Sequence, residues 1–276
     1  QNNIKGNIKK IENFSWVKNY KATDDHAIIV SGGQVNFLEV KRIQKKHNAK
    51  IFCVKHSYPR LLKNDIQPFG CVVLDPRPLE GESTHGFIRK DLFKKIDPST
   101  LFFIASMTDL SVTDYILERT DNVLGFHAFT DAVRDMTVTD RVKVNEELGI
   151  EKGELLISDG TCSATRTIGL LDTLGYRNVH LFGFDCSVSE KVANKGKDEV
   201  DGLGNPKYIH VETGGVKFWT TGELLAMAQD CEKLFDQTEI DMGIIFHGEG
   251  TLCAQVFENS MRGKEKHYSE LLNVAA

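Results

Sequence analysis

Two charged residues stand directly after one of the apolar runs of this sequence. Asp75 and Arg77, in the segment Asp75-Pro76-Arg77-Pro78, follow the run at 70–74. At the end of a strand in a parallel sheet, such a carboxylate can hold a hydrated Mg²⁺ ion or a ribose hydroxyl, and the guanidinium can bind a phosphate. The structural alternative is an Asp that caps the next turn and pairs with the Arg. The two charges together favour a catalytic role for both residues, with Asp75 as the metal ligand.

Adjacent glycines occur in the segment Ser31-Gly32-Gly33-Gln34, between an apolar run and a helical pattern that begins near Val35. These four residues and Asn36 are candidate nucleotide-binding residues. Glycines allow backbone N–H groups to approach a phosphate, and the following helix presents its positive N-terminus. The segment is neither a Walker A loop nor a G-x-G-x-x-G fingerprint. Two interpretations therefore stay open: a phosphate-binding turn, and a tight turn that needs glycine only for its geometry.

A second segment of small residues, Asp159-Gly160-Thr161, comes shortly before Ser163 and an apolar helical pattern. Hydroxyls and free N–H groups at a helix start can bind an anion. An ordinary N-cap formed by Thr161 or Ser163 would explain the same residue choice. Asp185, which follows a later apolar run, is a further expected ligand-binding residue.

His85, His127 and His247 are expected in loops or at strand ends, where each is a possible general acid or base. Of these, His85 and His127 are the candidate catalytic residues. A single histidine is more often an ordinary surface or core residue. No nucleophile-elbow motif accompanies either of them.

The elements that must position these residues alternate between apolar runs and amphipathic segments. This order predicts an α/β fold: a Rossmann-like, doubly wound, mainly parallel sheet with helices on both faces. One expected helix carries Val35, Leu38 and Ile43 on its apolar face and basic residues on the other. The strands are expected at 26–30, 50–54, 70–74, 101–105, 122–126, 179–183 and 242–246, and the helices at 35–46, 59–63, 87–95, 112–119, 164–174, 222–235 and 251–259.

The rest of the chain is expected to be less regular. A small β-hairpin is predicted near 208–219 and an exposed loop at 188–206. The domain prediction is an N-terminal helical lead at 1–25, one Rossmann-like domain at 26–260 and a loose charged tail at 261–276.

Composition narrows the classes of protein. The net charge is −5, whereas a nucleic-acid-binding protein typically has an excess of basic residues. No apolar run is long enough for a membrane span. None of the six cysteines forms a C-x-x-C pair, so the thiols are expected to be reduced and the location cytoplasmic. The expected partner is a small nucleotide ligand, with neither nucleic acid nor membrane; a homo-oligomer stays open.

Several of these motifs together resemble the MptE-like domain family. The matching residues are the run from Ala27 to Gly33, Asp75, Ser163, Leu174-Gly175-Tyr176 and Gly183-Phe184-Asp185. The family includes archaeal 6-hydroxymethylpterin pyrophosphokinases and motility-associated glycosyltransferases of flagellin modification. Bacterial sialyltransferases are more distantly similar, and in them the serine that matches Ser163 lies against the nucleotide.

The resemblance, which covers about residues 26–186, implies a transferase with a nucleotide or nucleotide-sugar donor and a small acceptor. A glycosyltransferase would use His85 or His127 as base and Arg77 at the departing phosphate. A pyrophosphokinase would need Mg²⁺ at Asp75.

Two alternatives remain outside the transferases. One is a nucleotide-binding protein without catalysis. The other is an NAD(P)-dependent dehydrogenase, which is disfavoured because Lys55-His56-Ser57 stands where a ribose-binding acid is expected.

Overall fold

A computed structural model describes residues 2–11, 15–80, 86–128, 138–150, 156–157, 162–201, 204–236, 242–248 and 250–262. Within these residues the main element is a nine-stranded sheet in which every paired strand is parallel. The strand order is β1-β6-β5-β4-β3-β2-β8-β11, and β7 pairs with β6 beside this path. Their bounds are β1 Ser15–Trp16, β2 Thr23–Val30, β3 Lys50–Val54, β4 Gly70–Val73, β5 Leu101–Ala105, β6 Val123–Ala128, β7 Leu156–Ile157, β8 Tyr176–Phe182 and β11 Gly243–His247.

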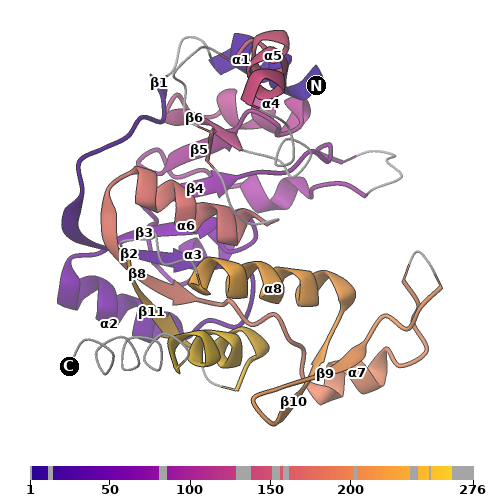
Figure 1. Cartoon of the computed structure of the whole chain (residues 1–276). Helices are drawn as coiled ribbons and strands as arrows, with labels where there is room; N and C mark the ends of the chain where they lie inside the picture. Colours follow the sequence, from indigo (N-terminus) through magenta and orange to yellow (C-terminus); the bar gives the residue numbers. More distant parts are fainter. Residues whose placement is uncertain are drawn as a thin grey trace.

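Helices cover both faces of this sheet (Figure 1). One face packs against α6, α8 and a helix at 252–262; the other packs against α1, α2, α3 and α4. The predicted Rossmann-like α/β fold is therefore confirmed. The helix bounds are α1 Asn2–Ile11, α2 Phe37–His47, α3 Tyr58–Lys63, α4 Leu110–Leu117, α5 Val138–Leu148, α6 Ser163–Thr173, α7 Glu190–Lys195 and α8 Gly222–Asp236.

The strands are nearly continuous apolar runs because both of their faces are covered. In β2, Ala27 and Ile29 pack on the α6 side, whereas Ile28 and Val30 pack on the α2 side, and all four are fully buried. The sheet therefore has one hydrophobic core on each face. The residues that follow the strands are therefore the ones available to line a cavity at the carboxyl edge of the sheet.

The predicted hairpin is present as β9 Ile209–Thr213 and β10 Val216–Thr220. Gly214 and Gly215 form its turn with φ values of 58° and 77°, which glycine adopts without steric cost. In Figure 1 the hairpin and α7 extend away from the sheet. Among the described helices, none has the length and apolar character that would let it span a bilayer.

Three local predictions were wrong. The helix expected at 87–95 is a short 3₁₀ helix, Lys90–Phe93. The backbone of Ile88 forms hydrogen bonds outside a helix, because its N–H donates to the Pro78 carbonyl and its carbonyl accepts from the Glu80 N–H. Leu38, which was expected on the apolar face of its helix, is 79% exposed. The buried face of α2 carries Val40 and Ile43. Leu38 is two positions before Val40, about 200° away around the helix axis, so its side chain lies on the opposite face.

The third wrong prediction is the loop at 188–206, which contains α7 and its buried Ala193. This helix forms because the Ser189 carbonyl accepts backbone hydrogen bonds from Val192 and Ala193. Most of the predicted charged tail, 263–276, lies outside the described residues.

Candidate functional site

The strand order reverses between β2 and β8, and this is where a cavity opens. From β2 the chain adds β3 to β6 on one side, whereas β8 pairs with the other edge of β2. Ligands of doubly wound sheets bind at the carboxyl ends of the strands at such a point. A cavity of about 550 Å³ lies there, lined by residues 31–33, 54–56, 74–77, 162–165, 183–187, 224, 227 and 231.

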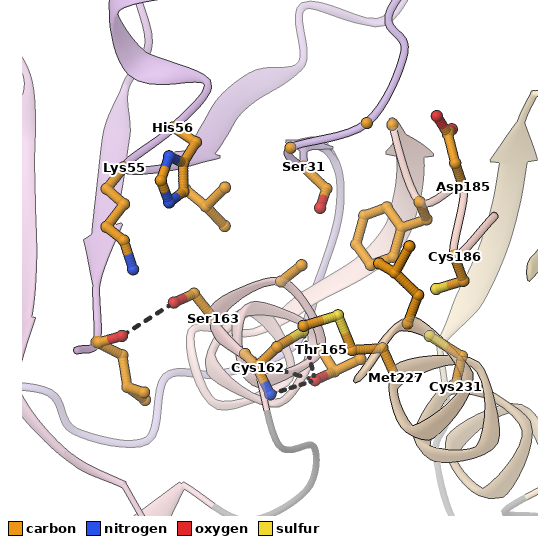
Figure 2. Close-up of a pocket in the computed structure, with 18 of the residues that line it drawn as sticks. Ser31, Lys55, His56, Cys162, Ser163, Thr165, Asp185, Cys186, Met227 and Cys231 are labelled. Carbon is orange, nitrogen blue, oxygen red and sulfur yellow. Dashed lines mark hydrogen bonds between the residues drawn. The ribbon is translucent and has the colours of Figure 1, made fainter. Parts of the chain in front are cut away.

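Figure 2 shows how the labelled side chains surround this cavity. Lys55 and His56 lie on one side, at the end of β3, and Asp185 and Cys186 lie on the other, after β8. The first turn of α6, with Ser163, lies between them.

A buried charge cluster joins the ends of β3 and β4. Lys55 and Asp75 form an ion pair in which both side chains are less than one tenth exposed. Arg77 donates from Nε and Nη2 to the two carboxylate oxygens of Asp75, at 2.9 and 2.7 Å, and its backbone N–H donates at 3.0 Å. Burial acts to raise the pKa of Asp75, but the hydrogen bond from Arg77 and the charge of Lys55 outweigh it and lower the pKa to about 2. The carboxylate is therefore charged and held by two cations.

The glycine turn after β2 is held by protein groups. The backbone N–H of Gln34 donates to Oδ2 of Asp185 at 2.7 Å. The guanidinium of Arg60 donates to the carbonyls of Gly32 and Gly33 at 3.0 and 2.8 Å. A Cβ on Gly33 would lie 2.6 Å from the Asp185 carboxyl group, whereas a Cβ on Gly32 would meet nothing within 4 Å. Of the two glycines, only Gly33 is required by packing.

This contrast gives a matched pair of variants. Gly33→Ala is expected to lower the free energy of unfolding by about 1–3 kcal/mol, because the new methyl group overlaps the Asp185 carboxyl group and the Gly183 carbonyl. Gly32→Ala is expected to change it by about 0.5 kcal/mol or less. Urea unfolding of both variants measures the difference, and equal losses would contradict the close approach at Gly33.

The N-terminus of α6, which packs on one face of the sheet, lines the cavity. Cys162 caps the helix together with Thr165, and the Ser163 hydroxyl donates to the Leu74 carbonyl at 3.1 Å. The first N–H groups of a helix and its dipole favour an anion at this end. The turn is anchored to the end of β4, so its position relative to Asp75 is well defined.

Among the residues that the structure describes, His56 is the one histidine that lines the cavity. The residue is exposed, but partial desolvation of its ring in the cavity, with the charges of Lys55 and Arg77, lowers the pKa of the imidazole below the ordinary value of 6.5. The ring is therefore neutral at physiological pH, the form in which it accepts a proton.

Three thiols lie close together on the side of the cavity opposite Lys55 and His56. Cys186, Cys231 and Cys253 place their sulfur atoms within 4.8 Å of one another, and Cys186 and Cys231 also line the cavity. Figure 2 shows the sulfurs of Cys186 and Cys231 side by side. Hydrogen bonds with Cys186, together with burial, raise the pKa of Cys231 and Cys253. All six cysteines of the chain are free.

Several residues singled out from the sequence come together here. The cavity lining includes Ser31, Gly32, Gly33, Asp75, Arg77, Ser163 and Asp185. Gln34 contributes through its hydrogen bond to Asp185, as described above.

Other candidates lie elsewhere. Asn36 is the N-cap of α2, where its side chain accepts from the Glu39 N–H at 3.2 Å. His127 is buried on β6, 3.0 Å from the Ser106 hydroxyl and stacked on Trp16, and is not among the residues that line the cavity. His85, Asp159, Gly160 and Thr161 lie outside the described residues.

Sequence reasoning placed Lys55 and His56 at a strand end but assigned them no role in the site, and it did not consider the thiols as site residues. Lys55 and His56 carried a usable signal, because they follow the apolar run at 50–54 as Asp75 follows its own. The thiols carried none, since Cys186, Cys231 and Cys253 come from a loop and two separate helices.

Comparisons with known proteins agree with this architecture. The model of a family described as "6-hydroxymethylpterin diphosphokinase MptE-like" matches residues 2–191. No curated protein matches the sequence. A solved structure of a MAf glycosyltransferase from Magnetospirillum magneticum AMB-1 is similar in fold, with a TM-score of 0.56 and 14% identity. The match covers 95% of this chain and 42% of that one, so the chain spans less than half of the structure that it resembles.

Proposed function

The chain belongs to the 6-hydroxymethylpterin diphosphokinase MptE-like family, and we propose that it is a transferase that binds a nucleotide-sugar donor in the cavity between β2 and β8 and transfers the sugar to a small acceptor. The family and the fold shared with a glycosyltransferase support a transferase. The choice of donor rests on the charges and the helix start in the cavity.

One observation carries the proposal: two cations and a helix N-terminus line the same part of the cavity. Lys55 and Arg77 lie there with the first turn of α6. Cationic side chains and helix N-termini are the groups that bind phosphate in proteins. Arg77, whose side chain is 41% exposed, has room to turn from Asp75 towards a ligand. We therefore assign the donor phosphates to this end of the cavity.

The surroundings of Asp75 favour a transfer that uses protein cations. Both carboxylate oxygens accept hydrogen bonds from Arg77, and Lys55 forms an ion pair with one of them. A Mg²⁺ ion at Asp75 would have to displace these cations and lie beside their positive charges. The residues present do not fit the ion there, and Lys55 and Arg77 can instead stabilise the departing phosphate.

His56 is the proposed general base. Its neutral imidazole accepts the proton of the acceptor hydroxyl, and the resulting oxygen bonds to the anomeric carbon of the donor sugar. The bond between that carbon and the phosphate oxygen breaks, and its electron pair stays with the departing nucleotide. In this scheme His56 takes the role that the sequence assigned to His85 or His127.

Ligand binding tests the proposal most directly. A nucleoside diphosphate at about one hundred times its Kd should add about 2.7 kcal/mol to the free energy of unfolding. Arg77→Ala is expected to weaken binding about tenfold to one-hundredfold, the value of about 1.5–3 kcal/mol for hydrogen bonds to charged groups. Arg89→Ala is the control, because Arg89 pairs with Asp91 on the surface.

The outcomes separate the functional classes. Nucleotide binding that Arg77→Ala weakens supports the proposed donor site. If no nucleotide or nucleotide-sugar raises the unfolding temperature in a thermal-shift assay, the proposed donor site is contradicted. Equal affinity in Arg77→Ala and wild type would remove Arg77 from the site.

A diphosphokinase is the second candidate, favoured by the description of the matching family. Incubation with a β,γ-labelled nucleoside triphosphate and, separately, with a sugar-labelled donor distinguishes the two. Labelled diphosphate in the product would replace the glycosyltransferase proposal.

A further inference from the structure

Four histidines lie close together on the face of the sheet that α2 covers, which is the face opposite α6. The histidine cluster consists of His26 on β2, His47 at the end of α2, His180 on β8 and His247 at the end of β11. His180 pairs in register with Ile28, which packs with the residues of α2. Its neighbours Val179 and Leu181 point to the opposite face, towards α6. The histidine cluster and the cavity therefore lie on different faces of the sheet.

The ring nitrogens are arranged as a set of ligand atoms. One nitrogen from each of His26, His47 and His180 lies within 4.8 Å of the other two. Nδ1 of His26 is 3.0 Å from Nε2 of His180, and the rings of His26 and His47 stack with centroids 4.1 Å apart. Three imidazoles from two strands and a helix end thus each place one ring nitrogen in the same small region, although they are far apart in the sequence.

A fourth imidazole orients this set. Nε2 of His247 is 2.9 Å from Nδ1 of His180, and the His247 ring stacks on Phe182 with an interplanar angle of 3°. When Nε2 of His180 is a ligand, its Nδ1 carries the proton and donates to His247. Metal-bound histidines commonly donate their second N–H in this way.

The surroundings of two of these rings disfavour their protonated form. Desolvation, the His26 imidazole and nearby cations lower the pKa of His47, and burial with the other three imidazoles of the cluster lowers that of His180 to about 4. Arg42 and Lys46 are the nearby cations and Glu39 is the nearby acid. Neutral imidazole is a ligand that borderline divalent ions such as Zn²⁺ prefer.

We propose that His26, His47 and His180 form a binding site for Zn²⁺, with His247 as the hydrogen-bond acceptor that orients His180. Three imidazole ligands and one water complete the tetrahedral coordination typical of zinc. His26 and His47 are only partly buried, so the ion and the water have access from solvent. The site ties the C-terminal end of α2 to β2 and β8, the strands that flank the cavity. It is independent of the proposed transferase activity.

The test uses the full chain without a histidine tag, stripped with EDTA, dialysed and titrated with ZnCl₂. We expect one Zn²⁺ ion to bind at this site and to raise the unfolding temperature. His26→Gln and His47→Gln are expected to lose that ion. Neither residue is fully buried, so both variants are expected to fold. His247→Gln is expected to keep the stoichiometry but to bind about 10–100-fold more weakly, as observed for partners of metal ligands.

Two controls separate this site from other zinc-binding groups. His210 contacts the Trp219 ring in the hairpin, so His210→Gln is expected to bind zinc as the wild type does. Cys231→Ser removes a member of the thiol cluster and is expected to leave the histidine-bound ion in place. Co²⁺ substitution reports the ligand type, because imidazole ligands do not produce the near-ultraviolet thiolate charge-transfer bands.

Two results would overturn the proposal. One is unchanged zinc binding in His26→Gln and His47→Gln, with loss in Cys231→Ser. The other is no zinc uptake by the stripped wild-type chain, which would leave the histidine cluster as a hydrogen-bonded stack of neutral rings.

Discussion

Replacing Asp75 by Asn is expected to lower the free energy of unfolding by about 3–5 kcal/mol, the usual cost of removing one partner of a buried ion pair. The reason is that the Lys55 ammonium, with a side chain that is 7% exposed, would stay buried without its counter-charge. Arg77 would lose its two-pronged hydrogen bond as well. Urea unfolding near neutral pH, followed by tryptophan fluorescence, measures the loss.

A double variant and a pH series check the cause. Combining Asp75→Leu with Lys55→Met removes both charges and is expected to recover most of the stability. The folded-state pKa of Asp75 is lowered from 3.8 to about 2. Its contribution is therefore fully present above pH 3.8 and is lost as the pH falls towards 2, where the wild type and Asp75→Asn should converge. A difference that does not depend on pH in this range would contradict the ion-pair explanation.

Replacing His56 by Gln is expected to lower kcat about 10²–10⁴-fold, the usual contribution of a general base. Nucleotide affinity should change little, because His56 is assigned to the acceptor and the phosphates are assigned to Lys55 and Arg77. Since partial desolvation and these cations lower the pKa of His56, the acid limb of the wild-type pH profile should lie below pH 6.5. The rate falls there because the base becomes protonated. Steady-state kinetics with the transferred group labelled measures both effects.

Two further histidine variants show whether the effect is specific. His210→Gln, on the hairpin, is the matched control and is expected to retain the wild-type rate. His127→Gln tests the base that the sequence suggested. A large loss of kcat in His127→Gln, with His56→Gln near the wild type, would overturn the assignment of His56.

The fold could be predicted because its signals are local. Fully buried parallel strands must be apolar on both faces, so β2, β3, β4 and β5 are recognisable as short apolar runs. The positions of the strand ends follow from the same runs. That is why the residues after β2, β4 and β8 could be selected as candidates from the sequence, and the structure brings them together around one cavity.

Partnerships between distant residues could not be predicted in this way. Asp75 was a candidate for Mg²⁺, and nothing in its own segment indicates that Lys55, twenty positions away, holds it. Asp185 was a candidate ligand for a nucleotide, yet it accepts the Gln34 N–H that such a ligand would have used. In both cases a protein group occupies the position that the sequence left free for a ligand.

The sequence by itself therefore determined which side chains reach the carboxyl edge of the sheet, because that depends only on where each apolar run ends. Tertiary structure decided which of them meet. The reversal of strand order placed Asp185 against Gly33, and the pairing of β3 with β4 placed Lys55 beside Asp75. The same packing brought four histidines together beneath α2. Contacts of this kind depend on strand order and helix placement, which are set by the burial of the whole core and are not encoded in any single segment.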